Sequence, residues 1–162
     1  MDSVSIEDYV FSFPAVSGLK KLPESLPVGS WISYQLSLEV FEAVTLQIGR
    51  LGSFTFRPGD YLYSGSARRG LKNRIDRHLR RKKKLRWHID YLLHSPAVEI
   101  YRVLISTRPE CELVQKGGGV VVVPGFGASD CRSGCGSHLR MVTVPDCKRK
   151  LQRTLASSVI VD

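Results

Sequence analysis

The amino-acid sequence predicts an α+β domain with a small antiparallel sheet of about three strands, flanked by helices. Two observations lead to this prediction. In the first half of the chain, apolar residues alternate over short segments, as they do in half-buried strands. Beyond Gly65 their spacing changes to that of an amphipathic helix. A chain of 162 residues is long enough for one domain with its own hydrophobic core, so it needs no disulfides to fold.

Three short strands are expected in the first half of the domain. Apolar residues alternate over residues 31–38 and again over residues 44–48. Residues 50–53 and 57–60 contain the glycine, proline and serine that are typical of turns, and a third strand is expected over residues 61–64. Because short strands joined by turns pair with their neighbours, this order favours an antiparallel sheet.

The strongest helical pattern follows Gly70. Leu71, Ile75, His78 and Leu79 recur at the spacing that places side chains on one side of a helix. Basic residues occupy the adjoining flank, so this helix is expected to bury one stripe against the sheet and to present a basic stripe beside it.

The second half of the chain alternates between the two patterns. Residues 87–94 are expected to be helical, and residues 98–106 form a nearly continuous apolar run that is typical of a buried strand. A short helix is expected over residues 110–116 and a strand over residues 120–123. Residues 124–137 then form a loop rich in cysteine and glycine.

The domain is expected to cover residues 29–145. Residues 1–28 contain three prolines and no sustained period, which predicts an N-terminal arm that is disordered in part. Residues 146–162 are assigned to a C-terminal tail. The sequence has neither the basic start and apolar run of a signal peptide nor an apolar run long enough to span a membrane, so we expect an intracellular protein: cytoplasmic, nucleoid-associated or nuclear.

The charge of the chain is concentrated in residues 68–86, called the basic segment below. Eleven of the 24 basic residues and one of the 15 acidic residues lie there, so the basic segment carries +10 and the rest of the chain −1. Such a patch predicts binding to a polyanion, because each neutralised phosphate releases counterions. DNA is the first expectation and RNA the alternative, whereas a membrane partner is not expected because the segment lacks a bulky apolar face. The residues expected to bind nucleic acid are Arg68, Arg69, Lys72, Arg77, Arg80, Arg81, Lys82, Lys83, Lys84 and Arg86.

A group of residues with catalytic chemistry stands at the start of the basic segment. The strand Tyr61-Leu62-Tyr63-Ser64-Gly65-Ser66 ends in glycine and small residues, and a basic helix with Arg74 and His78 follows it. Glycine lets a ligand approach the backbone closely. This order of strand and helix predicts that a tyrosine and an arginine meet at one site.

These residues resemble the GIY-YIG nuclease superfamily. Tyr63-Ser64-Gly65-Ser66 is similar to the second half of its motif, and Arg74 falls where the superfamily has its helix arginine. Further blocks resemble one branch, the GIY-YIG-like domain found alone or joined to endonuclease III DNA glycosylases. These blocks lie at residues 49–52, 58–67, 77–80, 87–93, 110–113, 125–131 and 137–139.

The resemblance implies metal-dependent hydrolysis of a phosphodiester, in DNA repair or nucleic-acid processing. In GIY-YIG enzymes a tyrosine acts as general base, an arginine steadies the phosphate, and a glutamate holds a divalent metal ion, Mg²⁺ or Mn²⁺. Carried over to this chain, the resemblance makes Tyr63 the second motif tyrosine, Arg74 the arginine and Glu110 the metal ligand, with Glu112 as the alternative metal ligand. The alternative function is a non-catalytic module that binds DNA or RNA on the same scaffold.

The first half of the motif departs from the family pattern. Tyr34 is the candidate first tyrosine, although Ile32 stands where the family has glycine. In a shifted match over residues 29–31, tryptophan replaces the tyrosine. His78 joins the catalytic candidates, and the residues expected to support the site are Ser66, His88 and Asp90.

The loop after residue 124 contains a second set of candidate ligands. Cys131, Cys135 and His138 offer three zinc ligands within eight residues, and a tetrahedral zinc site needs four. Cys111, Cys147 and His88 are the candidates for the fourth. The sequence thus predicts either a structural zinc site or a set of free thiols near the catalytic residues.

Overall fold

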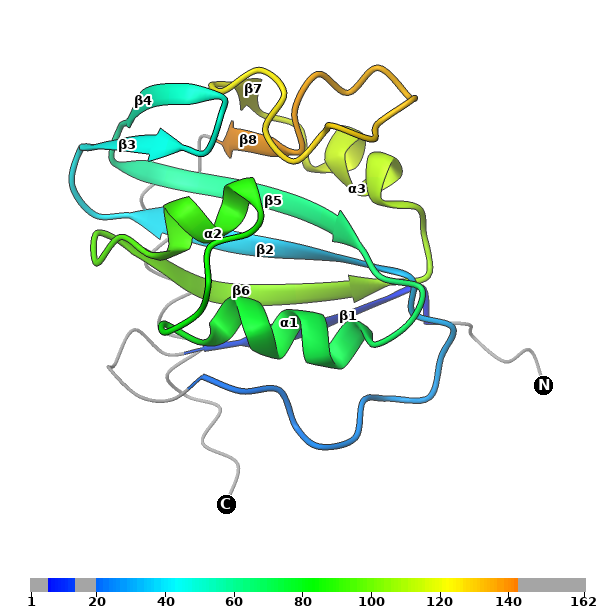
Figure 1. The fold of residues 1–162 in the computed structure, drawn as a ribbon. Coiled ribbons are helices and arrows are strands. Elements are labelled where there is room, and N and C mark those ends of the chain that lie inside the picture. The colour runs from blue at the N-terminus through cyan, green and yellow to red at the C-terminus, as the bar shows by residue number, and fades with distance from the viewer. Residues whose placement is uncertain (1–5, 14–19, 143–162) are drawn as a thin grey trace.

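The protein, described here by a computed structural model for residues 6–13 and 20–142, is built around one antiparallel sheet (Figure 1). Its strands are β1 (Asp8–Ser12), β2 (Ser33–Val40), β5 (Gly59–Ser66), β6 (Val98–Ser106), β7 (Val120–Val121) and β8 (Leu139–Val142). They are ordered β1-β6-β2-β5-β8-β7, and every neighbouring pair is antiparallel. The two central strands, β2 and β5, therefore have partners on both sides.

The α+β class is confirmed, but the expectation of about three strands in the sheet is wrong. The sheet has six strands: β2 and β5 lie in it as expected, the strand expected at residues 44–48 lies in a separate hairpin, and β1, β6, β7 and β8 complete the sheet. β1 comes from the arm expected to lie outside the domain, and it pairs with β6 almost 100 residues later in sequence. β8 follows directly on the cysteine- and glycine-rich loop. β1 and β8 are short strands. The alternation of apolar and polar residues, which predicts longer strands from the sequence, does not reveal them.

A separate hairpin consists of β3 (Val44–Ile48) and β4 (Gly52–Phe56). The turn expected at residues 50–53 lies slightly earlier, at residues 49–51, and a strand that was not expected follows it. Ile48 and Phe56 are buried in the core, and the hairpin packs against α2 (His88–Leu93).

Helices cover both faces of the sheet. Figure 1 shows α1 (Leu71–Leu79) and α2 lying across the same face. α3 (Glu110–Gly117) packs against the opposite face, where Gln35 donates a hydrogen bond to the backbone oxygen of Leu113 and Leu62 approaches Gly117. Because Tyr34 and Tyr63 alternate with Gln35 and Leu62 along their strands, the two tyrosines point toward α1.

The apolar stripe predicted for α1 is confirmed, since its four members are the buried residues of the helix. The preceding Gly70 has φ of 65°, a left-handed conformation that glycine adopts without a steric cost. The sharp turn at Gly70 lets the chain leave β5 and run straight into α1. The strand end and the helix start are consequently adjacent.

The N-terminal part of the chain contributes to the core. Leu22 is buried, and its backbone N–H donates a hydrogen bond to Asp76 of α1. The remainder of the predicted arm (residues 1–5 and 14–19) and the predicted tail (residues 146–162) lie outside the described residues. Among the helices that the structure describes, none has the length and apolar character required to cross a membrane.

Candidate functional site

A cavity of about 290 Å³ opens where β2 and β5 meet the starts of the helices. Four sequence-separated parts of the chain form it: the two strands, α1 with the segment before α2, the first turn of α3, and the loop of residues 124–138. Its walls are polar and aromatic. The residues that line it are Tyr34, Tyr63, Gly65, Ser66, Arg74, Arg86, Trp87, His88, Glu110, Gly127, Ser129, Asp130, Cys131 and His138.

Tyr34 and His78 form a buried pair below the cavity. The hydroxyl of Tyr34 lies 2.7 Å from Nε2 of His78, and the two residues are each 2% exposed. Burial, followed by the charge of Lys83, lowers the pKa of His78 to about 3, so the imidazole is neutral at physiological pH. A Cβ atom at Gly65 would lie 2.5 Å from the Tyr34 ring, so only glycine fits beneath this tyrosine. Trp31, the counterpart of Tyr34 in the shifted motif, instead donates its indole N–H to Pro27.

Tyr63 lies beside this pair and closes the cavity on the side of the loop. Its ring packs edge-on against His78 and against Phe126 of the loop. Gly127 has φ of 63°, and a Cβ atom there would lie 2.8 Å from the Tyr63 ring. Burial, followed by the charge of Glu110, raises the pKa of Tyr63, whereas Arg74 lowers it. Tyr34 shows the same pattern, with burial as the main cause of its raised pKa and Arg74 as the opposing charge.

Arg74 reaches the cavity from the first half of α1. Its guanidinium donates a hydrogen bond to the backbone oxygen of Ser66 and lies 5.1 Å from the ring centroid of Trp87. Trp87 is 39% exposed, in contrast to a tryptophan of the core. The arrangement fixes a cation and an exposed aromatic surface at the same opening, which are the two groups that bind a phosphate and a nucleobase.

The two candidate metal ligands on α3 differ in their surroundings. Glu110 lines the cavity, and one of its carboxylate oxygens lies 3.7 Å from Nδ1 of His138. Glu112 instead pairs with Arg108 and Lys116 on the surface of the helix. Of the two glutamates, it is therefore Glu110 whose carboxylate can reach a ligand in the cavity.

Asp90 and His88 have different roles in the structure. The fully buried Asp90 accepts two hydrogen bonds of 2.8 Å from the guanidinium of Arg77, as well as the backbone N–H groups of Arg86 and Trp87. Burial raises the pKa of Asp90, and the hydrogen bonds from Arg77 and the two backbone groups outweigh that effect, so its pKa is lowered. His88 lines the cavity and accepts the backbone N–H of Gly127 at Nδ1. Asp90 thus fixes the segment before α2, while His88 ties that segment to the loop.

The basic segment is divided between internal and solvent-facing cations. Lys83 donates to the backbone oxygens of Arg77 and His78 at the end of α1, and burial lowers its pKa to about 8. Lys72 pairs with Asp76 and Arg81 with Glu99. Arg81 is exposed although it pairs with Glu99. The other solvent-facing cations, called the outer set below, are Arg68, Arg69, Arg80, Lys82, Lys84 and Arg86. About half of the residues expected to bind nucleic acid therefore remain available for it.

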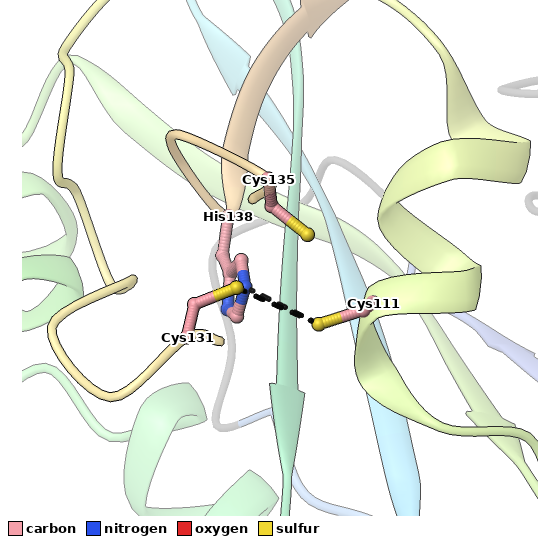
Figure 2. Close-up of side chains that lie close together, drawn as sticks. All are labelled: Cys111, Cys131, Cys135 and His138. Atoms are coloured by element: carbon pink, nitrogen blue, oxygen red, sulfur yellow. Dashed lines mark hydrogen bonds between the residues drawn. The ribbon is translucent and has the colours of Figure 1, made fainter. Parts of the chain in front are cut away.

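The structure brings the candidate zinc ligands together with a fourth residue. Cys131, Cys135 and His138 gather around Cys111 of α3, with all four ligand atoms within 4.8 Å of one another (Figure 2). A hydrogen bond from the backbone N–H of Cys135, followed by one from the side chain of His138, lowers the pKa of Cys131 to about 6. Burial, followed by the hydrogen bond with Cys111, raises the pKa of Cys135 to about 12. This cluster could hold a metal ion such as zinc.

Of the other candidates for the fourth zinc ligand, His88 does not join this cluster. His88 uses Nδ1 to accept the backbone N–H of Gly127, and it stands outside the group of four ligand atoms. Cys147 lies outside the described residues.

Two cavity residues, Trp87 and Asp130, lie in blocks that resemble the family, but the sequence assigned neither of them an individual role. The sequence does not show that the guanidinium groups of Arg74 and Arg77 lie over the Trp87 ring. Asp130 lies exposed in the loop and lines the cavity. The position of each depends on contacts between distant segments.

Comparison with known proteins gives the family of the chain. A family model described as a domain of unknown function, DUF123, matches residues 33–160, which is most of the chain. No curated protein and no solved structure matches it. The matched region contains every residue that lines the cavity. The chain therefore belongs to the DUF123 family of GIY-YIG-like domains.

Proposed function

We propose that this protein is a nucleic-acid endonuclease that hydrolyses a phosphodiester with the help of a divalent metal ion. The observation that carries the proposal is the meeting of Tyr34, Tyr63, Arg74 and Glu110 at one cavity. They come from four different elements, β2, β5, α1 and α3, and the two tyrosines, the arginine and the glutamate are the residue types that the chemistry of this superfamily uses.

Positioning of the substrate would fall to Arg74 and the aromatic ring beside it. The guanidinium can donate two parallel hydrogen bonds to a phosphate, which favours one orientation of the phosphodiester. Trp87, which is 39% exposed beside Arg74, would offer an aromatic surface to a neighbouring base, and such stacking tolerates any sequence. The outer set would hold the flanking phosphates through electrostatic attraction.

The acidic side of the cavity fits a magnesium ion. Magnesium is commonly held by one or two carboxylates together with waters and substrate phosphates, and Glu110 and Asp130 both line the cavity. When bound there, Mg²⁺ would supply Lewis-acid stabilisation of the leaving oxygen. Glu110 would hold the ion, and Asp130 would complete the acidic wall.

A tyrosine would take the proton from the attacking water. Both tyrosines have a raised pKa because they are buried, so the ionised form is scarce at neutral pH. Arg74 opposes this effect for each of them. The neutral imidazole of His78 can also accept the hydroxyl proton of Tyr34 in a hydrogen bond, since burial keeps its pKa near 3. We expect cleavage to accelerate as the pH rises above neutrality.

The test is a cleavage assay on labelled single-stranded, duplex, flapped and abasic DNA and on matched RNA, with Mg²⁺, Mn²⁺ or chelator. Abasic DNA is included because the resemblance of the sequence to one GIY-YIG-like branch implies a link to DNA glycosylases. Wild type is compared with Tyr63→Phe, Arg74→Ala and Glu110→Ala. Metal-dependent cleavage that is lost in all three variants is the expected result. Cleavage that survives in all three would place the chemistry elsewhere.

A binding module without catalysis is the second candidate, and the burial of both tyrosines favours it. Tyr34 is 2% and Tyr63 8% exposed, which leaves little room for water to reach either hydroxyl. The presence of Ile32 where the family has glycine also favours the binding module. Tight, salt-sensitive binding with no cleavage of any substrate would support this second function.

A further inference from the structure

We propose that Cys111, Cys131, Cys135 and His138 bind one zinc ion, and that this ion joins the start of α3 to the loop of residues 124–138. Figure 2 shows the four side chains converging from α3, the loop and the start of β8. The site is distinct from the magnesium site proposed at Glu110, and its ligands differ in kind. Thiolates and imidazole favour zinc, whereas carboxylates favour magnesium.

The distances agree with a tetrahedral metal centre. Zinc–sulfur bonds of about 2.3 Å place neighbouring ligands of a tetrahedron about 3.8 Å apart. The sulfur of Cys111 lies 3.7 Å from that of Cys131 and 3.8 Å from Nε2 of His138. All four ligand atoms lie within 4.8 Å of one another, so small side-chain movements would complete the tetrahedron. Four protein ligands leave no open position, which is typical of a structural site.

The location of the cluster explains what the ion would stabilise. The loop contains glycine at four positions, and its internal contacts include backbone hydrogen bonds such as Gly125 to Gly136 and His138 to Phe126. Ordering such a loop costs conformational entropy that its small apolar content offsets only in part. A metal bridge from Cys111 to Cys131 links positions 20 residues apart and would hold one wall of the cavity in place.

His138 connects the proposed zinc site to the cavity. Its Nε2 faces the thiols, and its buried Nδ1 has no hydrogen-bond partner but lies 3.7 Å from a carboxylate oxygen of Glu110. With zinc on Nε2, the proton is held on Nδ1 and faces that carboxylate, as in many carboxylate–histidine–zinc arrangements. The zinc site would thereby orient Glu110. Only this link rests on the proposed nuclease function; the metal site itself does not.

A disulfide between Cys111 and Cys131 is the competing interpretation of the short sulfur–sulfur distance. It would need a separation of about 2.05 Å and would leave Cys135 and His138 without a role. The two interpretations differ in metal content and in the number of free thiols, so one preparation distinguishes them.

The experiment measures zinc in the full-length chain, purified with a reductant and without chelator. We expect one zinc ion per chain, released in step with modification of thiols by an organomercurial reagent. Replacement by Co²⁺ should give the intense thiolate-to-metal absorption and the d–d bands of a tetrahedral site with three thiolates. A chain that is free of zinc and binds neither ion, or a Cys111–Cys131 disulfide in the purified protein, would overturn the proposal.

Two serine variants provide a matched comparison. Cys111→Ser should lose its zinc to a chelator that wild type resists, whereas Cys147→Ser should keep one equivalent. Equal retention of zinc in both variants would overturn the assignment of Cys111. If Cys111→Ser does not fold, the cobalt spectrum of wild type still counts the thiolates. None of these readouts involves nucleic acid, so failure of the nuclease proposal would leave the zinc result intact.

Discussion

The inner and outer cations of the basic segment have the same residue types but different surroundings. Arg77 and Lys83 bond to Asp90 and to the end of α1, so their charges hold the protein together beside the cavity, whereas Arg74 bonds to a backbone oxygen at the cavity itself. Arg80 and Lys82, from the outer set, face solvent. The difference shows that a charge count overstates the binding surface, because a cation that satisfies a buried carboxylate is not free for a phosphate.

The largest effect is expected at the ion pair between Arg77 and Asp90. Arg77→Ala should lower the free energy of unfolding by about 3 kcal/mol, because it leaves a buried carboxylate without its partner. Denaturant unfolding measures the loss. The matched change Arg80→Ala, three residues further along, should stay within about 0.5 kcal/mol of wild type. A similar cost for both variants would abolish the distinction between inner and outer cations.

Arg74 should affect chemistry rather than folding. Arg74→Ala is expected to slow cleavage by a factor of about 10² to 10³, comparable to the removal of one preorganised donor from a catalytic site. Single-turnover kinetics with substrate above its Kd separates this loss from weaker binding. Arg80→Ala under the same conditions should cleave at nearly the wild-type rate. Equal slowing in Arg74→Ala and Arg80→Ala would mean that Arg74 acts only through general electrostatic attraction of the substrate.

His78 extends the comparison to pH. Its pKa is about 3 in the folded protein and about 6.5 when unfolded, so only the unfolded chain gains this proton between those values. Stability should therefore fall as the pH drops from about 6.5 toward 3, by up to about 1.4 kcal/mol per pH unit from this residue. His78→Gln should flatten that slope in urea unfolding at a series of pH values. An unchanged slope would mean that His78 takes up its proton in the folded state.

The smallest effects are expected in the outer set, one residue at a time. Arg80→Ala and Lys82→Ala should each reduce the slope of log Kd against log salt by about 0.9 if each contacts one phosphate. Fluorescence anisotropy over a range of salt concentrations measures the slope. Arg57→Ala, an exposed arginine in the turn before β5, serves as the control of equal charge. Equal reductions in all three variants would indicate binding without a defined surface.

Local patterns in the sequence were sufficient for the central strand β2, for β3 of the separate hairpin and for α1. Alternation identified β2 and β3, and the stripe of Leu71 and Ile75 identified the buried side of α1. β1 and β8 were not predicted, since each owes its conformation to a distant partner: Tyr9 pairs with Ile105 and Leu139 with Tyr63.

For the candidate site too, the sequence identified individual residues but not the contacts between distant segments. The resemblance supplied Tyr63, Arg74 and Glu110, and the structure lines one cavity with all three. The resemblance did not predict the ion pair between Arg77 and Asp90. The two residues are 13 positions apart in sequence and meet only through the packing of α2 on the sheet. The choice of Cys111 among three candidate fourth ligands likewise depended on how α3 lies against the loop.

We propose that Glu110 holds a catalytic metal ion beside Tyr63 and Arg74. The most direct test is a Mg²⁺ titration of cleavage with Glu110→Gln and the neighbouring variant Glu112→Gln. We expect Glu110→Gln to lose cleavage or to need far more Mg²⁺, because the carboxylate in the cavity is gone. Glu112→Gln should follow wild type, because that side chain pairs with Arg108 and Lys116 on the surface. The same Mg²⁺ dependence in wild type and both variants would contradict the claim.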